Sequence, residues 1–305
     1  MFLPGVVHSF GSAMQEKYGE KVHKLAINAA FSCPNRDGSK GVGGCSFCNN
    51  RSFNPNARQV PAINIQIDRG QAVIQKRTGA RKYLAYFQAY TNTYADISLL
   101  KQNYDAALQE KNIIGLSVGT RPDCVPDAVL ALLADYQQQG QEVWLELGLQ
   151  SAFDKTLQRV NRGHGLAEYR DAVQRARTYG LKVCTHLIVG LPGESARDSL
   201  ESHRRVMEIG TDGLKLHPLH VVKNTLLATQ WRKGEYATLD FDEYVTVASE
   251  IIMHTPVEVI FHRLTATASE DILLAPLWCG KKWRVLNAIH DRLHHEQAQQ
   301  GSALH

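Results

Sequence analysis

The chain has 305 residues, of which 44% are hydrophobic, 21% charged and 8% aromatic, a composition typical of a folded globular protein and unlike that of a disordered or fibrous one. The 34 lysines and arginines, against 30 aspartates and glutamates, give a net charge of +4, too small to indicate a nucleic-acid-binding protein by itself. The first ten residues lack the basic and apolar regions of a signal peptide, and apolar runs such as 129–134 are too short to cross a membrane, so we expect a cytoplasmic protein without membrane contact.

Apolar β-rich runs alternate along the chain with segments of helical periodicity. The expected strands are 22–28, 82–88, 113–119, 143–149, 182–189 and 213–219. The expected helices are 66–78, 97–110, 126–139, 167–179 and 196–209. Ser195 and Asp198 have the spacing of a capping box before the last of these helices. This alternation requires parallel strands joined by right-handed crossovers.

Residues whose side chains can bind a metal or ligand, or take part in a reaction, follow five of the six expected strands. This favours a barrel, in which the strand ends converge, over an open sheet with one switch point. We therefore expect an α/β fold: a partial (βα)6 TIM-like barrel in residues 1–225 and a short, α-rich C-terminal extension in 226–305. The polar tail 290–305 indicates a frayed helix end that the fold does not need.

The loop that follows the first strand, 33–48, has the sequence CPNRDGSKGVGGCSFC. It contains three of the six cysteines, Cys33, Cys45 and Cys48. Clustered thiols in a glycine-rich loop indicate a metal site, and both zinc and iron–sulfur clusters bind such thiolates. A zinc site needs a fourth ligand, for which His8 or His23 is available. A cluster held by three thiolates instead leaves one iron open to an exogenous ligand.

These cysteines, Phe47 and the motifs described below resemble the radical S-adenosylmethionine (SAM) superfamily. Over about 22–225 the chain is similar to the branch that contains oxygen-independent coproporphyrinogen oxidase and the radical domain of the Elongator tRNA-modifying subunit. Within that branch it resembles the bacterial YhcC-like proteins, which share the long first cysteine gap. The resemblance implies a radical SAM barrel with a 4Fe–4S cluster on the three cysteines.

The resemblance also implies a radical SAM enzyme. SAM would chelate the free iron, and an electron from a reductant such as flavodoxin or ferredoxin would cleave SAM to methionine and a 5′-deoxyadenosyl radical, which abstracts hydrogen from the substrate. The sequence assigns no catalytic side chain and no oligomeric state.

The second and third strands end in two further motifs. Segment 87–94, FQAYTNTY, stands where relatives carry a SAM-amine loop, so Gln88, Tyr90 and Thr91 are candidate SAM contacts. Packed aromatic residues are the alternative for the tyrosine. Segment 119–123, GTRPD, resembles the Elongator-type E-T-R-P-D, with a glycine in place of the glutamate; a local ion pair between its arginine and aspartate is an equally good interpretation.

Segment 146–165, ELGLQSAFDKTLQRVNRGHG, resembles the family's E-x-G-x-Q-S stretch followed by R-G-H. By that likeness Gln150 and Arg162 contact SAM, the arginine by charge-assisted hydrogen bonds to the carboxylate. The alternative is a strand-end glutamine and a surface arginine.

The fifth and sixth strands supply the remaining candidates. Segment 186–194, HLIVGLPGE, resembles D-L-I-x-G-L-P-G-E, with His186 in place of the aspartate near the SAM ribose and Gly190 allowing close backbone approach; a plain strand-to-helix turn is the alternative. Lys215 and His217 are candidate barrel-mouth residues. Cys184 lies in a strand and is expected to be a buried thiol. The two remaining cysteines are Cys124 and Cys279. An auxiliary cluster or a reactive thiol at these two positions is the less favoured interpretation.

Basic residues gather in two segments. Segment 49–82 has seven basic residues and one acidic residue, a local charge of +6, beside the cysteine loop, and Trp283 lies among Lys281, Lys282 and Arg284. A solvated basic face is the ordinary interpretation, but together with the resemblance these residues favour a tRNA substrate modified at the wobble-uridine side chain. The alternatives are a radical enzyme acting on a small anionic or tetrapyrrole substrate, and a non-catalytic zinc-binding RNA-binding protein.

Overall fold

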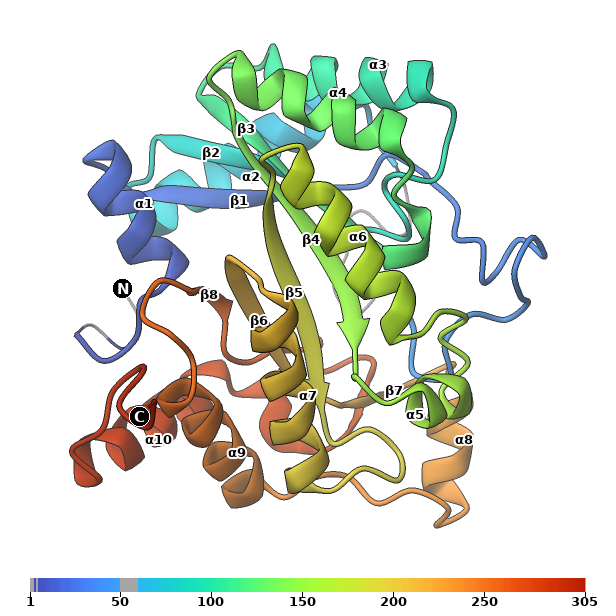
Figure 1. Cartoon of the computed structure of the whole chain (residues 1–305), viewed down its shortest axis with the longest axis vertical. Helices are drawn as coiled ribbons and strands as arrows, with labels where there is room; N and C mark the ends of the chain where they lie inside the picture. The colour runs from blue at the N-terminus through green and yellow to red at the C-terminus, as the bar shows by residue number, and fades with distance from the viewer. Residues whose placement is uncertain (1–2, 4, 50–59, 305) are drawn as a thin grey trace.

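The computed structural model describes residues 3, 5–49 and 60–304. Within them, seven strands form one parallel sheet in the order β1-β2-β3-β4-β5-β6-β8. The strands are β1 (Val22–Ile27), β2 (Lys82–Phe87), β3 (Ile113–Thr120), β4 (Glu142–Gln150), β5 (Lys182–Val189), β6 (Gly213–Pro218) and β8 (Ile260–Arg263). The sheet curls into a half-barrel (Figure 1), which confirms the expected fold class.

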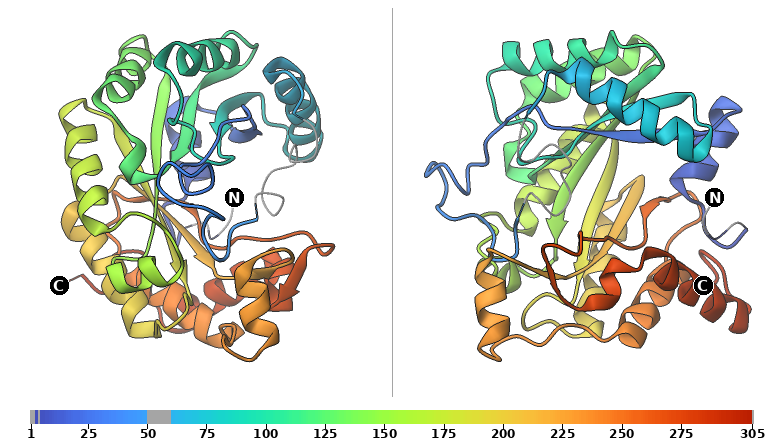
Figure 2. Two further views of the ribbon diagram at one scale, coloured as in Figure 1. Left: turned by 90° about the vertical axis from the view of Figure 1, so that its right-hand side faces the viewer. Right: turned by 180° about the vertical axis from the view of Figure 1, so that it is seen from behind.

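Helices cover the outer face of this sheet. Those that connect consecutive strands are α2 (Ile63–Thr78), α3 (Ile97–Leu108), α4 (Asp127–Gln138), α5 (Asp154–Arg159), α6 (Leu166–Thr178) and α7 (Ala196–Ile209). The remaining helices are α1 (Phe10–Tyr18), α8 (Leu226–Arg232), α9 (Phe241–Met253) and α10 (Lys282–His295), with short 3-10 turns η2 (Pro122–Cys124) and η3 (Leu277–Gly280). The helices form an arc that stays open between α2 and the C-terminal segments (Figure 2, left). No helix among the described residues is long and apolar enough to span a membrane.

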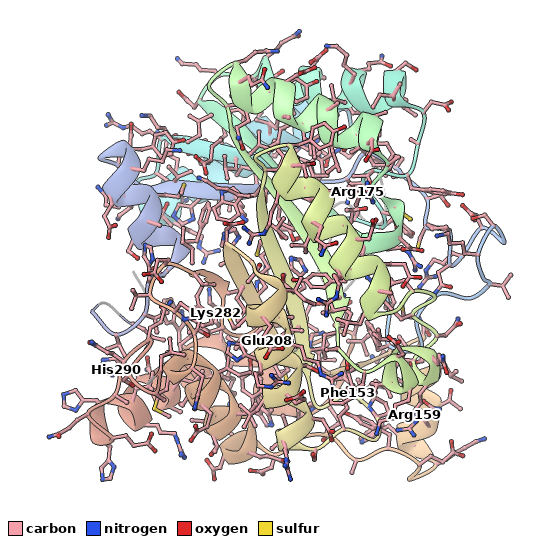
Figure 3. All side chains as sticks on the ribbon, viewed as in Figure 1. Phe153, Arg159, Arg175, Glu208, Lys282 and His290 are labelled. Atoms are coloured by element: carbon pink, nitrogen blue, oxygen red, sulfur yellow. The ribbon has the colours of Figure 1, made fainter. Side chains whose placement is uncertain are left out.

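Local sequence explains much of this order. The expected capping box is present: Ser195 Oγ accepts a hydrogen bond from the Asp198 amide, and the Asp198 carboxylate accepts one from the Ser195 amide at 2.8 Å. Neighbouring outer helices are also linked by Arg175 of α6, labelled in Figure 3, which donates to the Val125 carbonyl and pairs with Asp127 at 2.9 Å.

Strand β8, which pairs in parallel with β6, is not among the strands expected from the sequence. Its four residues, IFHR, are too few to show a strand periodicity, and its place in the sheet is set by partners far away in the chain. A second small sheet joins β7 (Val221–Val222) to β9 (Leu273–Ala275) in antiparallel pairing.

The interpretation of the C-terminal tail as a frayed end is wrong. Gln300 is only 4% exposed, and its side-chain amide donates to the carbonyls of Pro256 and Val259 while its Oε1 accepts the His8 amide at 2.8 Å. Leu293 is fully buried. The tail therefore ties the N-terminal segment to α9 and β8 through contacts that a polar composition does not reveal.

The concave interior of the half-barrel contains a buried charge network centred on Glu146 of β4. Its carboxylate lies 2.5 Å from Lys24 Nζ and 2.8 Å from His186 Nε2, and it also pairs with Lys215. Ser117 donates to it at 2.5 Å, and His262 lies 3.7 Å away. The network therefore receives groups from β1, β3, β5, β6 and β8.

Electrostatics keep this carboxylate ionised. Burial opposes its ionisation, but the ammonium groups of Lys215 and Lys24 outweigh burial and hold the Glu146 pKa well below its usual value. Burial lowers the pKa of Lys215 to about 7 despite the attraction of the carboxylate. The ammonium group also donates to the hydroxyl of Tyr86 on β2 at 2.9 Å, which brings the last of the seven strands into the network.

We predict that Glu146→Gln destabilises the protein by about 3–5 kcal/mol, because it leaves buried ammonium groups without a counter-charge. Urea denaturation of the variant, the wild type and the control Glu270→Gln, which changes an exposed glutamate, measures the effect. A loss below about 1 kcal/mol would show that the network does not hold the sheet together.

Candidate functional site

The cysteine loop after β1 is shaped by its own glycines and by Arg36. Gly44 has a φ of +78°, and a Cβ there would lie 2.7 Å from the Arg36 Nε atom, so only glycine fits. The Arg36 guanidinium donates to the Cys48 carbonyl at 2.8 Å. The arginine thus closes the loop on itself and brings its two ends together.

Hydrogen bonds seat this loop against the barrel. The Ser46 amide donates to the Val160 carbonyl at 2.9 Å, and the Ser46 carbonyl accepts the Leu227 amide at 2.8 Å. The Asn35 side chain donates to the Asn161 carbonyl, and the Asn161 side chain donates to the Gly44 carbonyl, at 2.5 and 2.8 Å. The loop is therefore held between the segment after α5 and the start of α8.

A buried ion pair at the end of β3 connects the loop to the turn that carries Arg162. Asp123 accepts two hydrogen bonds at 2.9 Å from Arg121, which is 2% exposed, and pairs with Lys40 of the loop at 2.6 Å. Arg121 also donates to the carbonyls of Arg162 and Gly163. Burial opposes ionisation of Asp123, but the hydrogen bonds from Arg121 and Lys40 lower its pKa. The expected local ion pair is thus present and positions the site.

The loop and the strand ends line a cavity of about 230 Å³. The expected residues in its wall are Cys33, Cys45, Cys48, Gln88, Tyr90, Thr91, Gln150, Arg162 and His186. His217, the candidate barrel-mouth residue, also lines the cavity, together with Tyr86, Arg36, His220 and Arg263. The structure therefore brings together residues from all seven strands of the sheet or from the segments that follow them.

Arg162 and Gln150 are fixed by the irregular end of β4. The pairing register shifts between Gly148 and Gln150, and Gln150 takes a φ of +81°, which is uncommon for a residue other than glycine. Arg162 is 9% exposed and donates to the Gly148 carbonyl at 2.5 Å and to Cys45 Sγ at 3.6 Å. The alternative of a surface arginine is therefore wrong.

The other expected contacts differ in their surroundings. Thr91 is fully buried and its hydroxyl has no partner within the described part of the chain, whereas Tyr90 is 41% exposed at a φ of +64° and is not packed in the core. His186 is engaged with Glu146, and burial lowers its pKa to about 4, so its ring is neutral at pH 7.

Two expected contacts lie away from the cavity wall. Gly190 has a φ of +89°, but a Cβ there would meet Leu239 at 3.2 Å, and its carbonyl accepts the Tyr236 hydroxyl. Lys215 is turned to Glu146 and Tyr86. The turn's Gly193 makes room for Arg159, whose nitrogen would lie 1.5 Å from an added Cβ. Both glycines therefore make room for side chains of the protein itself, Leu239 and Arg159. This agrees with the alternative of a plain strand-to-helix turn.

The donor set fits an iron–sulfur cluster better than zinc. His8 bonds the Val257 carbonyl, and neither His8 nor His23 lines the cavity with the cysteines. Among the described residues, no three His, Cys, Asp or Glu side chains converge as the ligands of one ion do. A cluster distributes its thiolates over separate irons, so it does not require such convergence. The Arg162 guanidinium beside Cys45 would stabilise thiolate charge.

Burial changes the acidity of one thiol of the loop, that of Cys48. It raises the pKa of Cys48 to about 11, with a further contribution from Cys45. Cys124, Cys184 and Cys279 are buried and do not line this cavity.

Three residues of the cavity wall are not among the candidates expected from the sequence: Tyr86, His220 and Arg263. The tyrosine lies within an apolar strand, and Arg263 ends the strand that was missed. In a parallel barrel, polar residues at the carboxyl ends of the strands are candidates for the site. Arg263 would have been such a candidate if its strand had been expected.

Comparisons with known proteins agree with this geometry. The family model described as the radical SAM superfamily matches residues 33–206, and the radical SAM C-terminal domain matches residues 211–295. Protein YhcC of Escherichia coli K12 is 51% identical over 304 residues, which is 100% of this chain and 97% of that protein. YtqA of Bacillus subtilis is 34% identical over 96% of this chain and 91% of its own length.

More distant relatives match in part. The tRNA uridine(34) acetyltransferase of Dehalococcoides mccartyi is 37% identical over 126 residues, 40% of this chain and 27% of that protein. The solved structure of Methanocaldococcus infernus Elp3 lacking residues 1–46 superposes with a TM-score of 0.64 at 18% identity, over 92% of this chain and 64% of that one. This chain thus spans less than two thirds of the Elp3 structure, and the likeness supports the fold alone.

We predict that Asp123→Asn speeds tryptic cleavage of the full chain after Arg36 and Lys40 about tenfold, because it removes the charge that ties the loop to β3. Mass spectrometry of timed digests locates the cuts. The control Asp135→Asn alters an exposed aspartate on α4 and should leave the rate unchanged. An unchanged loop cleavage rate in Asp123→Asn would contradict the positioning role.

Proposed function

This chain belongs to the radical SAM superfamily, and from that membership we propose that it modifies tRNA at the wobble-uridine side chain. Enzymes of this superfamily use a 4Fe–4S cluster and SAM. The observation that carries the radical SAM chemistry is the convergence of three cysteines and a buried arginine, Arg162, on one cavity beside the carboxyl ends of the strands. In parallel barrels that face is where reactions take place.

We assign the cluster to Cys33, Cys45 and Cys48. When bound and reduced, the cluster supplies the electron that cleaves SAM homolytically, which gives methionine and a 5′-deoxyadenosyl radical able to take a hydrogen atom from a substrate. The chain contributes the three thiolates, and Arg36 holds the Cys48 backbone in place.

The SAM contacts are assigned by the chemistry of the wall. Arg162, which still has an unpartnered Nε among the described residues, suits the carboxylate of SAM. Gln88, Thr91 and Gln150 offer amide and hydroxyl groups for its polar atoms, and Tyr90 offers a ring for the adenine.

Three other sequence candidates act around these contacts. Neutral His186 lines the cavity while its Nε2 stays bound to Glu146. Lys215 acts indirectly, by holding Tyr86 in the wall. Gly190 supports the turn after β5.

Positive charge outside the cavity supports a nucleic-acid substrate. Arg69, Lys76, Arg77 and Arg81 are exposed on or just after α2, and Lys282 and Trp283 are exposed at the start of α10. Burial, Arg263 and Arg77 lower the pKa of Lys282, labelled in Figure 3, so the two basic segments lie near each other. Arg51 and Arg58 lie outside the described residues. Such a grouping of cations attracts a phosphate backbone.

The relatives support the choice of tRNA. The Dehalococcoides protein is named as acting on tRNA uridine(34), and its similarity to this chain lies over 126 residues. We propose the same class of substrate here, with a reductant such as flavodoxin or ferredoxin as the electron source.

We predict that Cys45→Ala abolishes iron–sulfur cluster assembly and SAM cleavage, because the loop loses one of its three thiolates, while the barrel stays folded. Iron and sulfide content after anaerobic reconstitution, followed by assay of 5′-deoxyadenosine with dithionite, measures both. Cys184→Ala, a buried cysteine outside the cavity, is the control and should retain both properties. Undiminished product from Cys45→Ala would refute the assignment of the cluster.

We predict that deletion of the gene changes the modified uridines of tRNA. Nucleoside mass spectrometry of tRNA from the deletion strain should show loss of one uridine derivative, with restoration by the wild-type gene and not by Cys45→Ala. Identical nucleoside profiles in all strains would contradict a tRNA substrate while leaving the radical SAM chemistry intact.

A further inference from the structure

The carboxyl ends of β6 and β8 form a part of the cavity wall that none of the assignments above uses. His217 is the penultimate residue of β6, His220 follows that strand, and Arg263 ends β8. All three line the same cavity as the cysteines and Arg162. This part of the wall is called the β6–β8 subsite below.

A register irregularity turns Arg263 into the cavity. Leu214 pairs with Phe261, but the next residue, Lys215, pairs with Arg263, so one residue of β8 is skipped. That residue is His262, which contacts Glu146 and Lys24 in the interior. Because the bulge interrupts the alternation of the strand, two consecutive side chains reach the concave side. Without the bulge, Arg263 would point to the opposite face.

The polar groups of the subsite lack protein partners. Arg263 has no hydrogen bond or ion pair within the described part of the chain, although it is half-buried. His217 Nε2 is buried and also has no partner there. Buried polar atoms are nearly always hydrogen-bonded in folded proteins, because leaving them unpaired is costly. A ligand that enters the cavity can therefore supply the hydrogen bonds that such groups lack.

The charge of the subsite is positive. Burial and the nearby Arg263 hold the pKa of His217 well below its usual value, and burial lowers that of His220 to about 4, so both rings are neutral at pH 7. The carboxylate of Glu146 is shared among Lys24, Lys215 and His186 and does not pair with Arg263. The guanidinium therefore faces the cavity as an unneutralised cation.

We propose that Arg263, with His217 and His220 beside it, binds an anionic group of the substrate, a phosphate or a carboxylate, and so orients the substrate in the cavity that the three cysteines line. A guanidinium binds either group through two parallel hydrogen bonds. The neutral histidines add hydrogen bonds to the same group or to its neighbours. This inference rests on the proposed radical SAM function and names the class of substrate.

Calorimetric titration of the reconstituted enzyme with SAM present and no reductant tests the proposal, because binding then occurs without turnover. The probes are uridine, uridine 5′-monophosphate and uridine-5-carboxylic acid, which share a nucleoside and differ in the presence and position of the anion. We expect at least one anionic probe to bind about tenfold more tightly than uridine, and the preferred probe identifies the group as phosphate or carboxylate.

Variants locate the effect. Arg263→Gln should reduce the advantage of the anionic probe to less than about threefold, Arg263→Lys should retain part of it, and the control Arg170→Gln, an exposed arginine on α6, should retain all of it. SAM affinity and the melting temperature should stay near wild-type values in every variant, which excludes unfolding and an indirect effect on the cofactor.

Equal binding of all probes by the wild type, or an anionic advantage that survives Arg263→Gln, would overturn the proposal. Loss of SAM binding in Arg263→Gln with probe binding intact would also overturn it, because the arginine would then serve the cofactor. Unchanged tRNA nucleosides in the deletion strain, together with an Arg263-dependent anionic advantage, would contradict the tRNA substrate while supporting the subsite for a small anionic substrate.

Discussion

The buried carboxylate of Glu146 is the interaction on which the rest of the structure depends. A half-barrel has a concave face that must be filled, and here charged and polar groups fill it instead of an apolar plug. All seven strands of the sheet contribute one residue each to the network: Lys24, Tyr86, Ser117, Glu146, His186, Lys215 and His262. A fully connected buried network of this kind specifies one arrangement of its members, because any break leaves a charge unpaired.

The network also forms the floor of the cavity. Tyr86 and His186 belong both to the network and to the cavity wall, so the position of the wall follows from the position of the charge. On the other side, Asp123 and Arg121 connect the cysteine loop to the turn of Arg162. Two polar networks thus fix the cavity, one in the sheet and one in the cysteine loop. Together they preorganise the site that the superfamily's cofactors use.

Local patterns predicted the six longer strands, the connecting helices and the capping box at Ser195, because each depends on residues close in sequence. They also placed Cys33, Cys45, Cys48 and Arg162 in a common site through a motif likeness. They did not predict β8, the packed tail at Gln300 or the inward turn of Arg263. Each of these depends on a partner more than 40 residues away or on a bulge in the register of two strands, which composition and periodicity do not encode.

We propose that the three cysteines of the loop hold a cluster whose open iron SAM ligates. Electron–nuclear double resonance of the reduced, reconstituted protein with SAM labelled with ¹⁵N at its amino group and ¹⁷O at its carboxylate tests this directly. If SAM binds the cluster through its amino and carboxylate groups, both labels show hyperfine coupling to the cluster spin. A cluster signal that is the same with and without labelled SAM, or the absence of any cluster signal, would contradict it.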